Sequence, residues 1–153
     1  EFVMFILECG QREEMLPTVI SRCTELPLGD TLSSRSKKED EKATQTACAL
    51  IDALLNGTEF DVILASSAMH KNRALMKKTA EKLITVVRDA MAQNSSAPFL
   101  SGCERQALAL SMDYSQERLL KIKDAMDEII RFAEANANEN LLLSRFTSSL
   151  IQI

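Results

Sequence analysis

Apolar residues recur at intervals of three and four from Ala43 to the last residue of the chain. This spacing places apolar side chains on one face of an α-helix, so it predicts helices rather than strands throughout. The clearest faces hold Ala43, Ala47, Leu50, Ile51 and Leu54; Met76, Ala80, Leu83, Val87 and Ala90; Leu119, Ile122, Met126, Ile129 and Ala133; and Leu142, Phe146, Leu150 and Ile153. We therefore predict a mainly α-helical protein, with five or six helices packed as a bundle.

Capping residues predict where these helices begin and end. Asn56-Gly57 is typical of a helix C-terminus, and Thr58 with Asp61 three residues later predicts the start of a short helix. Asp113 or Ser115 is expected to cap the helix that follows, and Asn136-Ala137-Asn138 to interrupt it. The short helix after Thr58 is expected to bury Phe60, Ile63 and Leu64.

The first thirty residues have a different pattern. The apolar run Phe2 to Leu7 and the segment Glu25 to Leu28 predict two short strands, and Leu16 to Cys23 predicts a helix between them, with Pro17 in its first turn. Two short strands do not make a stable sheet, so this β-α-β unit is expected to be a remnant of a larger domain. The polar residues 31–42 predict a linker or the solvated start of a helix, which gives the division 1–30, 31–42 and 43–153.

Composition limits the class of protein. The 153 residues are 46% hydrophobic and 26% charged, which is typical of a globular protein with one moderate domain, or one domain and a fragment of another. The net charge of −4 gives no general attraction to nucleic acid, so we expect any contact with DNA to come through partners. Neither an apolar run of about 20 residues nor a signal peptide is found, and we expect a cytoplasmic protein without membrane contact.

Motifs for catalysis and for metal binding are missing from the sequence. A phosphate-binding GxxxxGK[ST] loop and a GxSxG motif are absent, so we expect no enzyme activity from this chain alone. The single histidine, His70, lies in a polar segment, and the cysteines form no CxxC pair, which argues against a zinc site. All four cysteines are expected to be reduced thiols: Cys9, Cys23, Cys48 and Cys103.

One short motif suggests a function. Pro17-Thr18 followed by Ser21-Arg22-Cys23, after an apolar strand, resembles the end of the AAA+ core in sliding-clamp loader subunits. In that family the arginine contacts the γ-phosphate of ATP bound to a neighbouring subunit. The resemblance implies that Arg22 acts catalytically in trans, supported by Pro17, Thr18, Ser21 and Cys23. Glu8 stands where ATP-hydrolysing relatives usually carry a polar sensor, which implies a subunit that binds no cofactor and leaves ATP to its neighbours.

The helical part is similar to the C-terminal collar domain of bacterial DNA polymerase III clamp-loader subunits. The similar features are the helix ending at Asn56-Gly57, the long helix with Arg88-Asp89, the turn 100–103 and the entry to the last helix. The three-helix lid expected between core and collar is missing. The resemblance implies assembly into a pentameric ring that loads the sliding clamp in DNA replication. Its implied partners are the motor and delta subunits, with the clamp and primer-template DNA reached through the complex.

Two alternatives remain open. Arg22 is equally consistent with an ordinary surface arginine that interacts with the last carbonyls of its helix. The bundle is equally consistent with a stand-alone helical interaction or regulatory module without catalysis. In either reading, four leucine and phenylalanine positions are candidates for contact with a partner: Leu119, Phe132, Leu141 and Leu143.

Overall fold

The computed structural model describes residues 6–7, 15–24, 26, 34–93 and 97–152. The chain divides into two compact units, Glu1–Leu32 and Ser33–Ile153. Seven helices and no strand occur in these described ranges. No helix among them combines the length and the apolar character that a membrane crossing requires.

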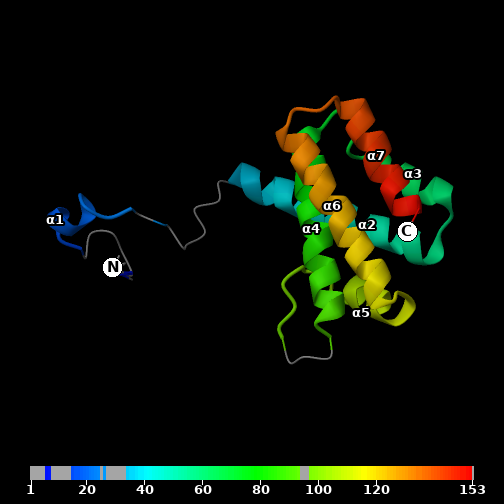
Figure 1. Cartoon of the computed structure of the whole chain (residues 1–153), viewed down its shortest axis with the longest axis horizontal. Coiled ribbons are helices and arrows are strands. Elements are labelled where there is room, and N and C mark those ends of the chain that lie inside the picture. The colour runs from blue at the N-terminus through cyan, green and yellow to red at the C-terminus, as the bar shows by residue number, and fades with distance from the viewer. Residues whose placement is uncertain (1–5, 8–14, 25, 27–33, 94–96, 153) are drawn as a thin grey trace. The chain divides into compact units, whose positions relative to one another are not determined.

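The second unit is a six-helix bundle (Figure 1). It therefore confirms the predicted mainly helical fold and bundle for this part of the chain. The helices are α2 (Ser34–Asn56), α3 (Glu59–Ser67), α4 (Arg73–Met91), α5 (Glu104–Asp113), α6 (Gln116–Glu134) and α7 (Glu139–Ile151).

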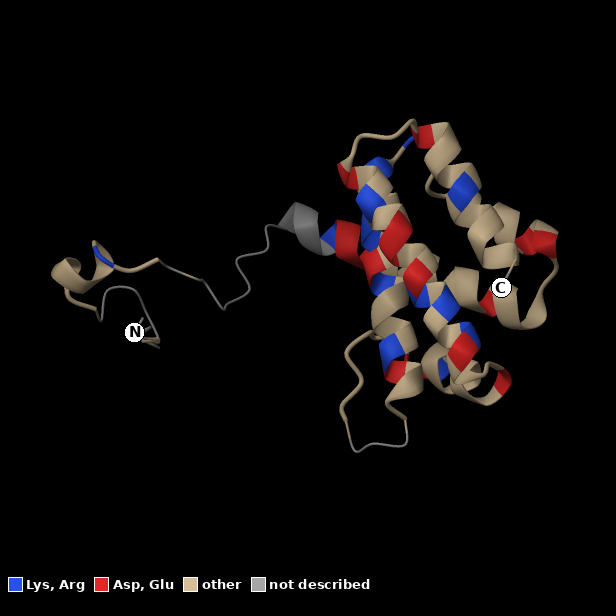
Figure 2. Cartoon of the chain, in the orientation of Figure 1, with Lys and Arg blue, Asp and Glu red and all other residues tan. Residues whose placement is uncertain are grey.

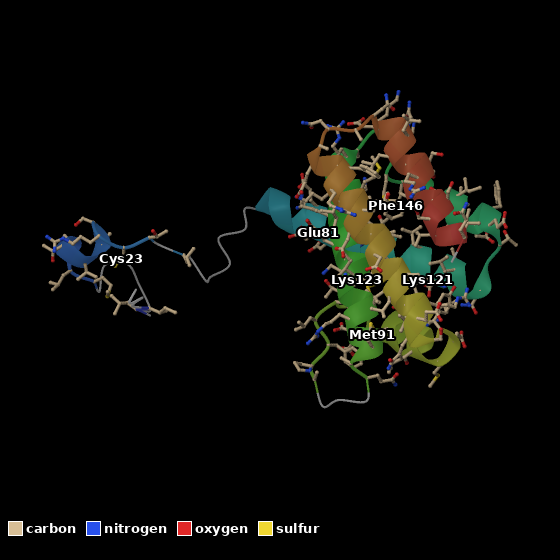
Figure 3. The ribbon with its side chains drawn as sticks, in the orientation of Figure 1. Cys23, Glu81, Met91, Lys121, Lys123 and Phe146 are labelled. Carbon is tan, nitrogen blue, oxygen red and sulfur yellow. A yellow bond between two sulfur atoms is a disulfide. The ribbon has the colours of Figure 1, made fainter. Side chains whose placement is uncertain are left out.

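Helix α4 lies at the centre of the bundle. It packs most extensively against α6, and also against α2 and α5, while α7 lies against α6 and α3 (Figure 1). The predicted apolar face of α4 is buried along its whole length, and Phe146 of α7 is fully buried in the common core (Figure 3). The core thus follows the three- and four-residue spacing of the sequence.

Local signals set the helix ends. The Thr58 amide donates to Oδ2 of Asp61 at 2.7 Å, and Asn72 Oδ1 accepts from the amide of Leu75 at 2.9 Å. Ser115, rather than Asp113, caps α6 by accepting from the amide of Arg118. Asn138 caps α7 by accepting from the amides of Asn140 and Leu141.

The segment 31–42 is a helix start rather than a linker from Ser34 onward, because α2 begins there. Lysine and glutamate are good helix formers. This part of α2 is also held against the bundle by ion pairs with α4. Lys78 of α4 pairs with Asp40 at 2.8 Å and with Glu39 at 3.2 Å. Of the two alternatives for this polar segment, the start of a helix is the one observed over residues 34–42.

The first unit does not support the predicted β-α-β remnant. Its described helix is α1 (Pro17–Ile20), a single turn with Pro17 in its first position. Ile6, Leu7 and Leu26, the described residues of the two expected strands, lie in no strand, and the other residues of those segments lie outside the described ranges. A short strand without neighbouring strands has no backbone partners to hold it, which is consistent with this result.

Candidate functional site

Arg22 lies in the turn that directly follows α1. The backbone of this turn is held by the Ser21 amide donating to Pro17 O at 3.0 Å, and by the Arg22 amide donating to Val19 O at 3.0 Å. Ser21 Oγ also donates to Thr18 O at 3.2 Å. The Ser-Arg-Cys segment is therefore fixed to the single helical turn before it.

The Arg22 side chain is exposed. Its guanidinium has no hydrogen bond or ion pair within the described ranges, and it does not bind the last carbonyls of α1. Pro17, Thr18 and Cys23 are also exposed. The motif thus presents the Arg22 side chain to solvent, and no second charged group lies against it among the described residues.

The cysteines differ from the expectation of four reduced thiols. Cys48 of α2 forms a disulfide with Cys103 at the start of α5, with Cα atoms 6.2 Å apart. Cys23 is free and exposed in the first unit (Figure 3), and Cys9 lies outside the described residues. The prediction failed for the pair because packing of α2 on α5 brings together two residues that are far apart in the sequence.

Asp89 near the end of α4 anchors the turn that enters α5. Its Oδ2 accepts from the amides of Leu100 at 2.9 Å and Ser101 at 2.8 Å, and its Oδ1 accepts from Arg88 at 2.8 Å. Burial opposes the charged carboxylate, but the hydrogen bonds from Ser101, Leu100 and Arg88 outweigh it and lower the pKa of Asp89. A cavity of about 180 Å³ lies next to this carboxyl group, lined by Ala97, Pro98, Phe99 and Leu108 among others. Since every oxygen of Asp89 is engaged, we assign this carboxylate a structural role.

Helix α3 exposes the apolar residues that were expected to be buried. Phe60, Ile63 and Leu64 are 67%, 50% and 59% exposed, and we call these three residues the α3 stripe. Val62 and Ser66 are the buried residues of this helix instead. The Ser66 hydroxyl donates to Val62 O at 2.8 Å, so its burial leaves no unpaired donor.

The α3 stripe was missed because its helix is apolar on most of its circumference. Only Glu59 and Asp61 are charged in the helix, and both lie in its first turn. The informative signal was residue size: Ala65 and Ser66 on the packed side are small, which permits close approach to neighbouring helices. Figure 2 shows α3 almost without charge beyond its first turn, whereas α4 and α6 carry charges of both signs.

The four positions expected to contact partners have different environments. Phe132 of α6 and Leu141 of α7 are 41% and 70% exposed. Leu143 is half-buried against the core, and Leu119 is fully buried, so the expectation of a partner contact is wrong for Leu119. His70 is exposed in the turn after α3.

Metal ligands do not gather anywhere in the described part of the chain. In comparisons with protein-family models, with curated proteins and with solved structures, nothing matches this chain.

Proposed function

We propose that this chain is a non-catalytic subunit of a DNA polymerase III clamp loader, similar to the bacterial delta prime subunit. In this proposal the six-helix bundle is the collar domain, which joins the motor and delta subunits in the pentameric ring. Residues 1–30 are the end of an AAA+ core, and Arg22 is its arginine finger. The subunit binds no cofactor itself, and it acts in the cytoplasm on the sliding clamp and primer-template DNA through the complex.

The exposed Arg22 is the observation that carries this proposal. Phosphoryl transfer places negative charge on oxygens of the transferring group, and a guanidinium supplied by a neighbouring subunit stabilises that charge. Such a residue has to be accessible in the isolated subunit and held on a fixed backbone. Arg22 meets both requirements, since its side chain is exposed and its amide is bonded to Val19 O.

The test compares clamp-loader complexes reconstituted with wild-type chain and with Arg22→Ala, within the full-length subunit. We expect the variant to assemble normally, which gel filtration measures, but to lose most DNA- and clamp-stimulated loading activity. An arginine supplied in trans contributes about 10³ to 10⁵ in rate, so the loss at that one ATP site is expected to be large while total ATP turnover falls only in part. Arg22→Lys is expected to rescue incompletely, because lysine lacks the planar fork that binds two oxygens at once.

A stand-alone interaction module is the second candidate, and the α3 stripe favours it. An exposed apolar helix face indicates a binding surface whether or not Arg22 has a role. Co-purification with the motor and delta subunits separates the two functions. A chain that assembles with neither subunit, but is stable and monodisperse, is a module of another kind.

A further inference from the structure

The α3 stripe has the spacing of a helix-binding surface. Phe60, Ile63 and Leu64 stand at positions i, i+3 and i+4, so they form one ridge on the solvent side of α3. The opposite side of the same helix is packed against α2 and α7 through Val62 and Ser66. The ridge therefore takes no part in the bundle core.

Retaining three large apolar side chains in water has a free-energy cost that a partner would remove. Burying such side chains against a partner is favourable, because it removes their apolar surface from water. Polar residues at these positions would stabilise the isolated bundle equally well, because none of the three contributes to its core. Their exposure is thus explained by a contact outside the bundle.

The charge around the ridge indicates what its partner carries. Glu59 lies one turn before Ile63 and is exposed, and Asp61 is exposed in the same turn. The remaining residues of α3 carry no charge. A partner that lies along the ridge therefore meets carboxylates at one end and apolar side chains over the rest.

The size of the ridge argues against a second copy of this chain. A stable dimer buries about 800 Å² on each partner from 20 to 30 residues, and three side chains on a nine-residue helix supply only part of that area. A ridge of this length fits about two turns of one helix. It is large enough to be one contact among several in an assembly that is also held elsewhere.

We propose that the α3 stripe binds an amphipathic helix of a neighbouring subunit, with a basic side chain of that helix placed against Glu59. This inference rests on the proposed function, because the neighbour is a motor or delta subunit of the clamp loader. The contact is apolar along Phe60, Ile63 and Leu64, and the charged pair at its end sets the direction of the bound helix.

The experiment measures binding of the full 153-residue chain to purified motor and delta subunits, by gel filtration and by titration with a fluorescent label. Ile63→Glu is expected to weaken binding more than tenfold, because it places a carboxylate in the centre of the apolar contact. Glu59→Lys is expected to weaken binding several-fold, and added salt should reduce the difference between wild type and this variant. Met112→Glu is the matched control, since Met112 is 80% exposed at the end of α5 and lies outside the stripe.

The outcomes distinguish the inference from the proposed function. Wild-type chain that fails to bind the motor and delta subunits overturns the proposed function, and the inference that rests on it falls too. Wild-type chain that binds, together with an Ile63→Glu variant that is folded by circular dichroism and binds as tightly as Met112→Glu, overturns the inference alone. Sedimentation showing that wild-type chain is a dimer and Ile63→Glu a monomer assigns the stripe to a second copy, which also overturns the inference.

Discussion

Reduction of the disulfide between Cys48 and Cys103 is expected to destabilise the bundle strongly. The two cysteines are 55 residues apart in the sequence, so the bond closes a long loop in the unfolded chain. The loop-entropy relation for that length gives about 4 kcal/mol of stabilisation at 25 °C. Small domains are stable by only about 5–15 kcal/mol, so this one bond carries a substantial share of the total.

The assay is thermal unfolding of the full chain, followed by the helical signal in circular dichroism with and without a thiol reductant. For a unit of this size, a loss of about 4 kcal/mol corresponds to a fall in midpoint of roughly 10 to 20 °C. Comparing oxidised with reduced wild type is the cleanest measurement, because the side chains are otherwise unchanged. Cys48→Ser should unfold near the reduced wild type and should no longer respond to reductant.

Cys23→Ser is the matched control, because Cys23 is free and exposed in the first unit. It is expected to leave both midpoints unchanged. Mass spectrometry after thiol alkylation establishes that the bond is present before the melt. Equal midpoints for oxidised and reduced chain would refute the loop-entropy reasoning, and failure of Cys48 and Cys103 to pair on air oxidation would refute the bond between them.

Three further predictions concern the bundle. Phe146→Ala should cost about 3–5 kcal/mol of unfolding free energy in urea titrations, because Phe146 is fully buried, whereas Leu141→Ala on the same helix should cost less than about 1 kcal/mol. Asn138→Ala should cost about 1 kcal/mol by removing the α7 cap, and an equally stable variant would show that the cap is dispensable. Asp89→Asn should cost about 2 kcal/mol of unfolding free energy at pH 7. The pKa of Asp89 is lower in the folded than in the unfolded chain, so the wild type should lose this stability advantage as the pH falls below about 4. A stability difference between wild type and variant that stays constant down to about pH 2 would contradict the structural role of Asp89.

The long helices could be predicted from the sequence because each has one apolar face and one polar face. The buried residues Met76, Leu83 and Val87 of α4 are those that the repeat indicates. In such a segment only one rotation of the helix buries the apolar side chains, so local pattern and tertiary packing agree.

The orientation of α3 could not be predicted in the same way. Its sequence allows two faces, one with Phe60, Ile63 and Leu64 and one with Val62 and Ser66. Which face is buried depends on how closely α3 packs against α2 and α7, and the sequence of α3 does not specify this tertiary packing. The disulfide is a second example, since Cys48 and Cys103 meet only because α5 packs on α2.

The candidate site was predicted in part. The sequence predicts a helix over Leu16 to Cys23 with Pro17 in its first turn, and the structure has a shorter helix, Pro17–Ile20, so that Ser21 to Cys23 follow the helix instead of ending it. The role of Arg22 remains a prediction, because it depends on a neighbouring subunit. In the proposed function the γ-phosphate belongs to ATP bound by another subunit, so the sequence of this chain does not define where it lies relative to Arg22.

The turn that enters α5 is closed by two bonds of different chemistry, two residues apart. The amide of Ser101 is held by the Asp89 carboxylate, and Cys103 is held by the sulfur of Cys48. Acid weakens the first bond by protonating Asp89, and a thiol reductant breaks the second. Amide hydrogen exchange at Leu100 and Ser101 should therefore respond to acid, whereas release of Cys103 from Cys48 should respond to a thiol reductant, so the two bonds can be tested separately.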